Sequence, residues 1–187
     1  MNGSSPRDLI ELRVDKIAQL FHTLDPVPFR QRDLDKEAEE FIVGWARELA
    51  DNCPIAIIIY APDAEARTRE AREVQEAFQG YFSRHAVAVQ RELNELFRIG
   101  RRSLGIGASI LAVCLLLAHA AGGHLVDSPF RRLVEESFLI LGWVANWRPL
   151  EIFLYDWLPL ARRRNLYRRL GDASVVLKPR SSAAEGI

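Results

Sequence analysis

The chain has 187 residues, of which 49% are hydrophobic and 27% are charged. This composition excludes an intrinsically disordered chain and a chain that lies wholly inside a membrane, and the length allows one or two small domains. Because 25 basic residues balance 25 acidic ones, no overall field attracts nucleic acid or an acidic partner, and we expect no nucleic-acid binding.

The N-terminal segment and the two cysteines bear on location. Residues 1–16 lack the basic stretch and the apolar core of a signal peptide, so we expect them to stay in the cytoplasm. Cys53 precedes an apolar run, whereas Cys114 lies within the longest apolar segment. These settings predict unpaired, inert thiols in a reducing compartment.

The first hundred residues are predicted to form a small α/β module. Residues 10–14 (IELRV) alternate in polarity as a β-strand does, and residues 16–24 are predicted to form a short amphipathic helix that ends before Pro26 and Pro28. Residues 54–62 (PIAIIIYAP) are typical of a strand buried on both faces. A helix between the two strands implies parallel pairing through a right-handed crossover.

That helix is expected over residues 32–50. Asp33 or Asp35 caps its N-terminus, where acidic side chains suit the helix dipole. Its predicted apolar face consists of Phe41, Ile42, Trp45 and Leu49. Such a stripe is typical of a helix that packs on a core.

A long helix is predicted over residues 63–102, and it runs almost directly into the first apolar segment. Opposite charges four residues apart support this helix. Its apolar stripe, close to heptad spacing, consists of Val74, Phe78, Tyr81, His85, Val89, Leu93 and Leu96. Packing of the stripe against the local sheet or a C-terminal helix is favoured over a role in oligomerisation.

The first predicted membrane span covers residues 103–123, which carry no formal charge. This length suits a hydrocarbon core about 30 Å thick, and the Leu, Ile and Val residues contribute about −4 kcal/mol on the insertion scale. A transmembrane helix is therefore favoured over the buried helix of a soluble protein. Small residues that allow close helix packing recur at Gly105, Ala108, Ser109 and Ala112, and in the second apolar segment at Gly142 and Ala145.

The second predicted span covers residues 134–156. Its charge-free core, residues 137–147, is too short to cross a membrane alone, so a complete span also takes in charged residues. Unpaired charges inside a membrane are costly, and we therefore expect them to be paired. The predicted intramembrane charge cluster consists of Arg148, Glu151, Asp156, Arg101 and Arg102.

Two arrangements are open for residues 148–158. This segment either completes the second span, with a kink at Pro149, or lies as a helix along the membrane interface. Tyr155 and Trp157 are the predicted interfacial anchors, because aromatic rings with a polar tip favour the head-group region.

Arginine placement sets the predicted topology. Arginines cluster before the first span and after the second, whereas the link between the spans contains Arg131 and Arg132. By the positive-inside rule, both termini are cytoplasmic and the link faces outside.

The C-terminal residues 159–187 are predicted to contain a basic helix closed by Gly171, a short strand over residues 174–177 and a disordered tail. The strand is free to join the N-terminal sheet, because both ends share the cytoplasmic side. The predicted division is a module over residues 1–100, a transmembrane hairpin over residues 101–158 and this C-terminal segment. The fold class is an α+β membrane protein: a two-helix transmembrane hairpin and a small cytoplasmic α/β module, with a long helix leading into the first span.

No catalytic, cofactor-binding or metal-binding residue is predicted. The four histidines, His22, His85, His119 and His124, lack the spacing of metal ligands. The glycines of residues 105–107 lie inside an apolar segment rather than after a strand, which excludes a phosphate-binding loop.

Three segments carry a resemblance to a known family: residues 24–35 (LDPVPFRQRDLD), 100–107 (GRRSLGIG) and 141–157 (LGWVANWRPLEIFLYDW). Over nearly its whole length the chain resembles a group of bacterial two-span membrane proteins with no known activity. In that group two tryptophans often end the segment after the Arg-Pro pair, whereas here Leu158 follows Trp157. The resemblance implies a bacterial inner-membrane location and implies no activity.

The favoured function is that of a non-enzymatic, membrane-anchored interaction or scaffold protein. Its expected partners are the lipid bilayer and either a second protein or a second copy of the chain. The alternative is an oligomeric pore or transport accessory that uses Arg148, Glu151 and Asp156, because ionisable residues inside membranes are often functional. An enzyme with its site on the cytoplasmic module is the weakest hypothesis.

Overall fold

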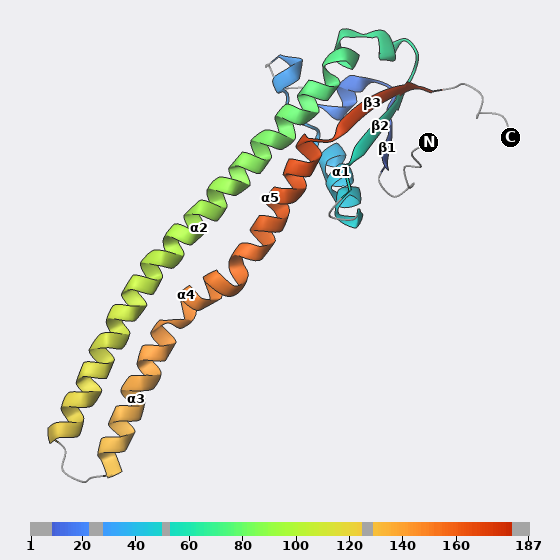
Figure 1. Ribbon diagram of the computed structural model, residues 1–187. Helices are drawn as coiled ribbons and strands as arrows, with labels where there is room; N and C mark the ends of the chain where they lie inside the picture. The colour runs from blue at the N-terminus through green and yellow to red at the C-terminus, as the bar shows by residue number, and fades with distance from the viewer. Residues whose placement is uncertain (1–8, 23–27, 50–52, 125–128, 181–187) are drawn as a thin grey trace. The chain divides into compact units, whose positions relative to one another are not determined.

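The structure is a computed structural model that describes residues 9–22, 28–49, 53–124 and 129–180 (Figure 1). It divides into two compact units: residues 1–88 with residues 163–187, and residues 89–162. The second unit is therefore an insertion between two parts of the first. This division differs from the predicted boundaries at residues 100 and 158, because the C-terminal strand belongs to the same sheet as the N-terminal strands.

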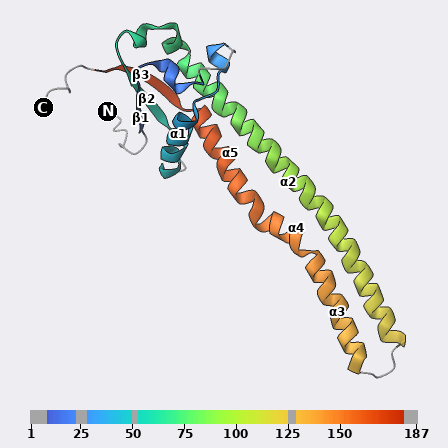
Figure 2. The ribbon, with the colours of Figure 1, turned by 180° about the vertical axis from the view of Figure 1, so that it is seen from behind.

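The first unit is an α/β module. In chain order its elements are β1 (Leu9–Arg13), 3-10 turns at Ile17–Leu20 and Phe29–Gln31, α1 (Lys36–Glu48), β2 (Ala56–Ala61), a 3-10 turn at Glu65–Arg67, the start of α2 (Arg69–His124), the end of α5 (Trp157–Gly171) and β3 (Ser174–Pro179). The strand order is β1-β2-β3, and both strand pairs are parallel (Figures 1 and 2). The predicted small α/β module with a long helix is confirmed at this level.

The amphipathic helix predicted over residues 16–24 is wrong for residues 16–22: the chain makes a single 3-10 turn there, and Phe21 then forms an antiparallel bridge with Leu34. Residues 23 and 24 lie outside the described residues. The carbonyl of Leu20 accepts a hydrogen bond from the N–H of Asp35 at 2.9 Å, and the N–H of His22 donates to the carbonyl of Asp33 at 2.9 Å. These bonds hold the segment extended, so a helix cannot continue through it.

Large apolar side chains fill the core of this unit. Ile10, Ile57 and Ile59 lie on one face of the sheet, and each is completely buried. Phe78 of α2 is also completely buried, and it meets Phe21 edge-on with 5.8 Å between the ring centroids. The apolar run of β2 therefore lies in the centre of the sheet, as its composition predicts.

Helix α1 begins as predicted, but the face that it buries differs from the predicted one. Asp35 is the N-cap, and its side chain accepts the N–H of Glu37 at 3.0 Å. Ile42 is completely buried, whereas Phe41 and Trp45 are 44% and 48% exposed. The predicted apolar face is therefore wrong for these two aromatic residues, because the helix turns Ile42, with its neighbours on that side, toward the core.

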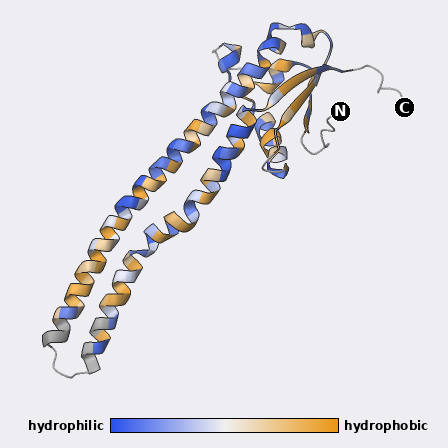
Figure 3. Cartoon of the chain, in the orientation of Figure 1, coloured by the Kyte–Doolittle hydropathy of each residue, from blue (hydrophilic) through white to orange (hydrophobic). Residues whose placement is uncertain are grey.

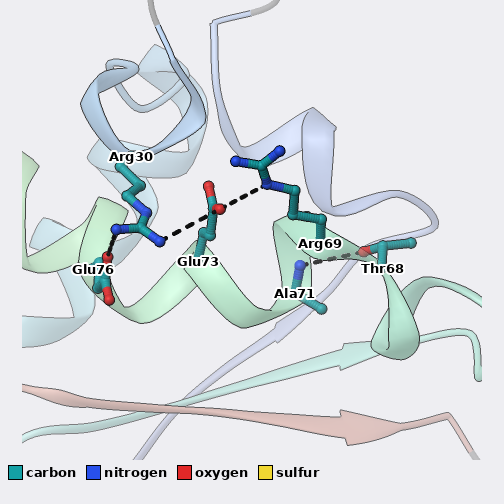
Figure 4. Close-up of polar contacts among 6 residues, drawn as sticks. All are labelled: Arg30, Thr68, Arg69, Ala71, Glu73 and Glu76. Atoms are coloured by element: carbon teal, nitrogen blue, oxygen red, sulfur yellow. Dashed lines mark hydrogen bonds and ion pairs between the residues drawn. The ribbon is translucent and has the colours of Figure 1, made fainter.

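The start of α2 is fixed by polar contacts (Figure 4). The Thr68 hydroxyl accepts the N–H of Ala71 at 3.2 Å, as a helix cap does. Buried Glu73 lies between two guanidinium groups, 2.9 Å from Arg69 and 3.6 Å from Arg30. The hydrogen bond from Arg69 lowers the pKa of Glu73, and Glu73 in turn raises the pKa of Arg69.

The apolar stripe predicted along this helix is buried. Five of its members are at most 5% exposed, namely Val74, Phe78, Tyr81, Val89 and Leu93. Burial raises the pKa of the Tyr81 hydroxyl, and the Glu39 carboxylate adds to this effect. The stripe is thus used for packing within the chain.

Helix α2 also holds the C-terminal strand. The Gln75 side chain accepts the N–H of Val175 at 2.6 Å through its oxygen and donates to the carbonyl of Ala173 at 3.1 Å through its nitrogen. One amide side chain thereby satisfies two backbone groups at the start of β3. Contacts so distant in sequence cannot be read from local periodicity.

The second unit is an antiparallel helical hairpin. The second half of α2 forms one leg, and the other leg comprises α3 (Pro129–Ala145), α4 (Trp147–Glu151), a π-helical segment (Ile152–Asp156) and the start of α5 (Figures 1 and 2). The predicted kink is present, but it lies at Asn146, before Pro149. Proline lacks an N–H and cannot bond to the carbonyl of Ala145, so the helix breaks just after that residue.

Within the described residues, α2 is the one helix long and apolar enough to cross a membrane by length and composition. Apolar residues are concentrated in its second half and along α3 (Figure 3). The apolar stretch of the return leg, Glu136–Ala145, is shorter than a full span. The second span therefore stays a prediction.

Candidate functional site in the helical hairpin

Asn146 connects the two legs of the hairpin. Its Nδ2 donates to the carbonyl of Gly107 on α2 at 3.0 Å and to the carbonyl of Gly142 on α3 at 2.9 Å. Its backbone N–H donates to the carbonyl of Trp143 at 3.0 Å and closes the turn between α3 and α4. A side-chain amide that bridges two apolar helices fixes their register.

Glycines allow the two legs to approach closely around Asn146. A Cβ atom at Gly107 would lie 2.8 Å from the Oδ1 of Asn146 and 2.9 Å from the carbonyl oxygen of Ala145. At Gly142 it would lie 2.5 Å from a methyl group of Leu111. A larger side chain at Gly107 would meet a backbone oxygen and push the helices apart. At Gly142 the nearest atom is the end of the Leu111 side chain, which can move aside.

The small residues that were predicted to allow close packing of α2 do not lie in the contact between the two legs. These residues, Gly105, Ala108, Ser109 and Ala112, are all exposed. The contact seam instead contains Gly100, Gly107 and Cys114, which are buried at heptad intervals and continue the stripe of Val89 and Leu93. Continuing that heptad along the sequence would have identified this seam.

The contact between Gly107 and Asn146 defines the antiparallel register of the legs. In an antiparallel pair, each residue further along one leg lies opposite a residue one position earlier on the other leg. Counting in this way from Gly107 and Asn146 places Glu151 opposite Arg102. Arg148 then lies about one turn further along the apolar segment. The predicted charges on the return leg are therefore at the end of the apolar part of the hairpin, beside the last arginines of α2, and not at its centre.

Arg148 is paired on its own leg. Its Nη1 lies 2.8 Å from the Oε2 of Glu151 and 3.4 Å from the Oδ2 of Asp156. The structure therefore brings together three members of the predicted charge cluster. Arg101 and Arg102 are exposed, and in the described part of the chain neither forms an ion pair. The predicted pairing across the two legs is absent, because Arg148 already engages both carboxylates.

The π-helical segment is stabilised by Trp157. The indole Nε1–H of Trp157 donates to the carbonyl of Phe153 at 2.9 Å. Both rings also lie against Phe97 of α2, with centroid distances of 6.1 Å to Phe153 and 6.4 Å to Trp157. The indole thus donates to a backbone carbonyl inside the wider helical turn.

The aromatic residues predicted as anchors differ in their surroundings. Tyr155 is 67% exposed, as an anchor requires. Trp157 instead packs into the hairpin and uses its N–H internally. Trp143 and Trp147, which were not predicted, are 63% and 70% exposed. Their place beside an apolar run is a sequence pattern from which an interfacial position can be predicted.

Across the described residues, no group of three His, Cys, Asp or Glu side chains is placed to hold a metal ion. No family model, curated protein or solved structure matches this chain. The fold by itself defines the class: a small parallel α/β module into which an antiparallel helical hairpin is inserted. Membership of the bacterial two-span group stays a prediction.

Proposed function

We propose that this chain is a two-span protein of the bacterial inner membrane whose α/β module and both termini lie in the cytoplasm. The main support is the exposure of α2, since 11% of its most apolar stretch is buried. The core helix of a soluble protein is mostly buried. A lipid environment accounts for such a long apolar surface, which a soluble monomer rarely exposes.

The sheet supports two crossings rather than one. Ser174 of β3 pairs with Ala56 of β2, so the chain returns to the module from which α2 departs. If α2 crosses the bilayer, the return leg must cross it as well. Exposed apolar residues on that leg fit a lipid-facing surface; they include Ile140, Trp143, Val144 and Trp147.

We further propose that the module binds another protein and so positions it at the membrane, with no enzymatic activity. The observation that carries this proposal is the exposed pair Phe41 and Trp45, whose ring centroids are 6.1 Å apart. Gly44 lies beside them with nothing within 4 Å of a Cβ position, which leaves room for a partner. Exposed aromatic residues are frequent energetic centres of protein interfaces.

The charges around this aromatic surface indicate the character of the partner. Glu37, Glu40 and Glu48 are exposed on the same helix, as are Arg47 and Lys36, and Lys36 lies 3.8 Å from Glu40. A surface that combines aromatic rings with carboxylates is complementary to a partner segment with apolar and basic side chains.

A photoreactive residue at Glu48 in the full chain, within native membranes, tests this proposal. We expect one dominant protein adduct, which the double variant F41A/W45A should lose because each aromatic truncation costs about 2 kcal/mol of binding. The control is R47A, which changes an exposed residue of the same helix and should keep the adduct. An adduct of equal yield in F41A/W45A would contradict the proposal.

The second candidate, an oligomeric pore or transport accessory, relies on Arg148, Glu151 and Asp156. Two spans cannot enclose a pathway, so this function requires a defined oligomer. The internal pairing of these charges accounts for their presence without a relay. A monomer in lipid nanodiscs would eliminate the pore.

A further inference from the structure

We propose that Arg101 and Arg102 form a binding site for the phosphate of an anionic phospholipid in the cytoplasmic leaflet. This inference rests on the proposed membrane insertion of the hairpin. Both arginines are exposed, and in the described part of the chain neither forms an ion pair. They are the last charged residues of α2 before the uncharged stretch that begins at Ser103.

The return leg does not neutralise these two guanidinium groups. Glu151 lies level with Arg102, but its carboxylate is 2.8 Å from Arg148. Asp156 lies 3.4 Å from the same Arg148 nitrogen. Both nearby carboxylates are therefore shared with Arg148, and the charge of Arg101 and Arg102 is left to attract an anion from outside the chain.

The neighbouring side chains favour an amphiphilic anion over a soluble one. Leu104 follows Arg101 by three residues and is 44% exposed, and Ile106 follows Arg102 by four residues and is 63% exposed. Residues at these spacings lie on the same side of a helix. Each guanidinium group is thus followed, along the direction of the proposed span, by an aliphatic surface that suits an acyl chain.

The chemistry of arginine fits a phosphodiester head group. A guanidinium group donates two parallel hydrogen bonds to phosphate oxygens and loses little hydration in doing so. Basic residues next to a membrane span gain about fivefold each in preference for anionic lipid. Two adjacent arginines therefore predict a preference of roughly 25-fold for an anionic phospholipid over a zwitterionic one.

The test uses the full chain in nanodiscs of phosphatidylcholine with a graded fraction of phosphatidylglycerol. After the protein is released from the nanodiscs, native mass spectrometry counts the lipids that stay bound to it. We expect wild type to retain phosphatidylglycerol selectively, R101Q/R102Q to lose this selectivity, and R101K/R102K to keep an intermediate level. R98Q is the matched control, because Arg98 lies one turn away and already pairs with Glu95 at 3.2 Å.

Retention of phosphatidylglycerol by R101Q/R102Q at the wild-type level would overturn the proposed site. Binding of inorganic phosphate by the wild-type chain without selective retention of phosphatidylglycerol would also overturn it, because a soluble anion would then be the ligand. Failure of the wild-type chain to enter nanodiscs would overturn membrane insertion and this inference together. Normal insertion of R101Q/R102Q with unchanged lipid selectivity would overturn the lipid site alone.

Discussion

At the scale of single residues, two glycines of α2 have opposite surroundings. Gly107 faces the return leg, and a Cβ atom there would lie 2.9 Å from the backbone oxygen of Ala145. Gly105 has nothing within 4 Å of its Cβ position. Composition alone does not distinguish these two residues, but the register set by Asn146 does.

Alanine at each glycine tests this register. G107A should destabilise the hairpin by about 1–3 kcal/mol, because the legs must separate or a backbone must shift. G105A should cause no loss and can gain up to about 1 kcal/mol from the higher helix propensity of alanine. Reversible unfolding of the full chain in mixed micelles measures both values. Equal losses in the two variants would contradict the register.

At the scale of elements, β3 depends on a side chain of α2. Gln75 satisfies the N–H of Val175 and the carbonyl of Ala173. Q75A should leave both groups without these bonds and lower the local stability of β3 by about 1–3 kcal/mol. Hydrogen exchange at the amides of β3 reports this change.

The adjacent variant E76A is the control for Q75A. Glu76 is 55% exposed at its side chain and forms a surface ion pair with Arg30, whose loss costs at most about 1 kcal/mol. Exchange in β3 should therefore stay close to that of wild type. Equal acceleration in both variants would show that Gln75 does not specifically hold the strand.

Local patterns predicted the elements better than the contacts between them. The apolar run of β2 and the stripe of α2 have strong periodic signals, and both elements are present. In α1 the apolar residues allow two overlapping faces, and the sheet selects the one with Ile42, which leaves Phe41 and Trp45 outside. The rotation of a helix depends on its partner, so periodicity alone does not determine it.

In the candidate site, too, local patterns predict more than they do for contacts between elements. Arg148 and Glu151 could be paired from their spacing along one helix. Asn146 could not be assigned, because its partners lie on another helix and its own helix breaks at that point. The lack of an ion pair at Arg101 and Arg102 among the described residues also depends on tertiary contacts, since Glu151 and Asp156 are engaged by Arg148.

At the scale of the whole molecule, β3 bears on the proposed membrane topology. Its parallel pairing with β2 returns the C-terminal segment to the N-terminal sheet. If the hairpin enters the bilayer as proposed, it therefore crosses an even number of times, although the apolar helix Glu136–Ala145 is shorter than an ordinary span. A short apolar core with charges at its end fits a crossing in which arginine side chains extend to the head groups.

Cysteine labelling in intact cells tests this topology most directly. Single cysteines replace Arg132, at the start of α3, and Asp172, just before β3, in a chain with C53S and C114A. A membrane-impermeant thiol reagent should label the Arg132→Cys variant in intact cells and the Asp172→Cys variant only after permeabilisation. Labelling of both variants only after permeabilisation would contradict the proposed two-span topology.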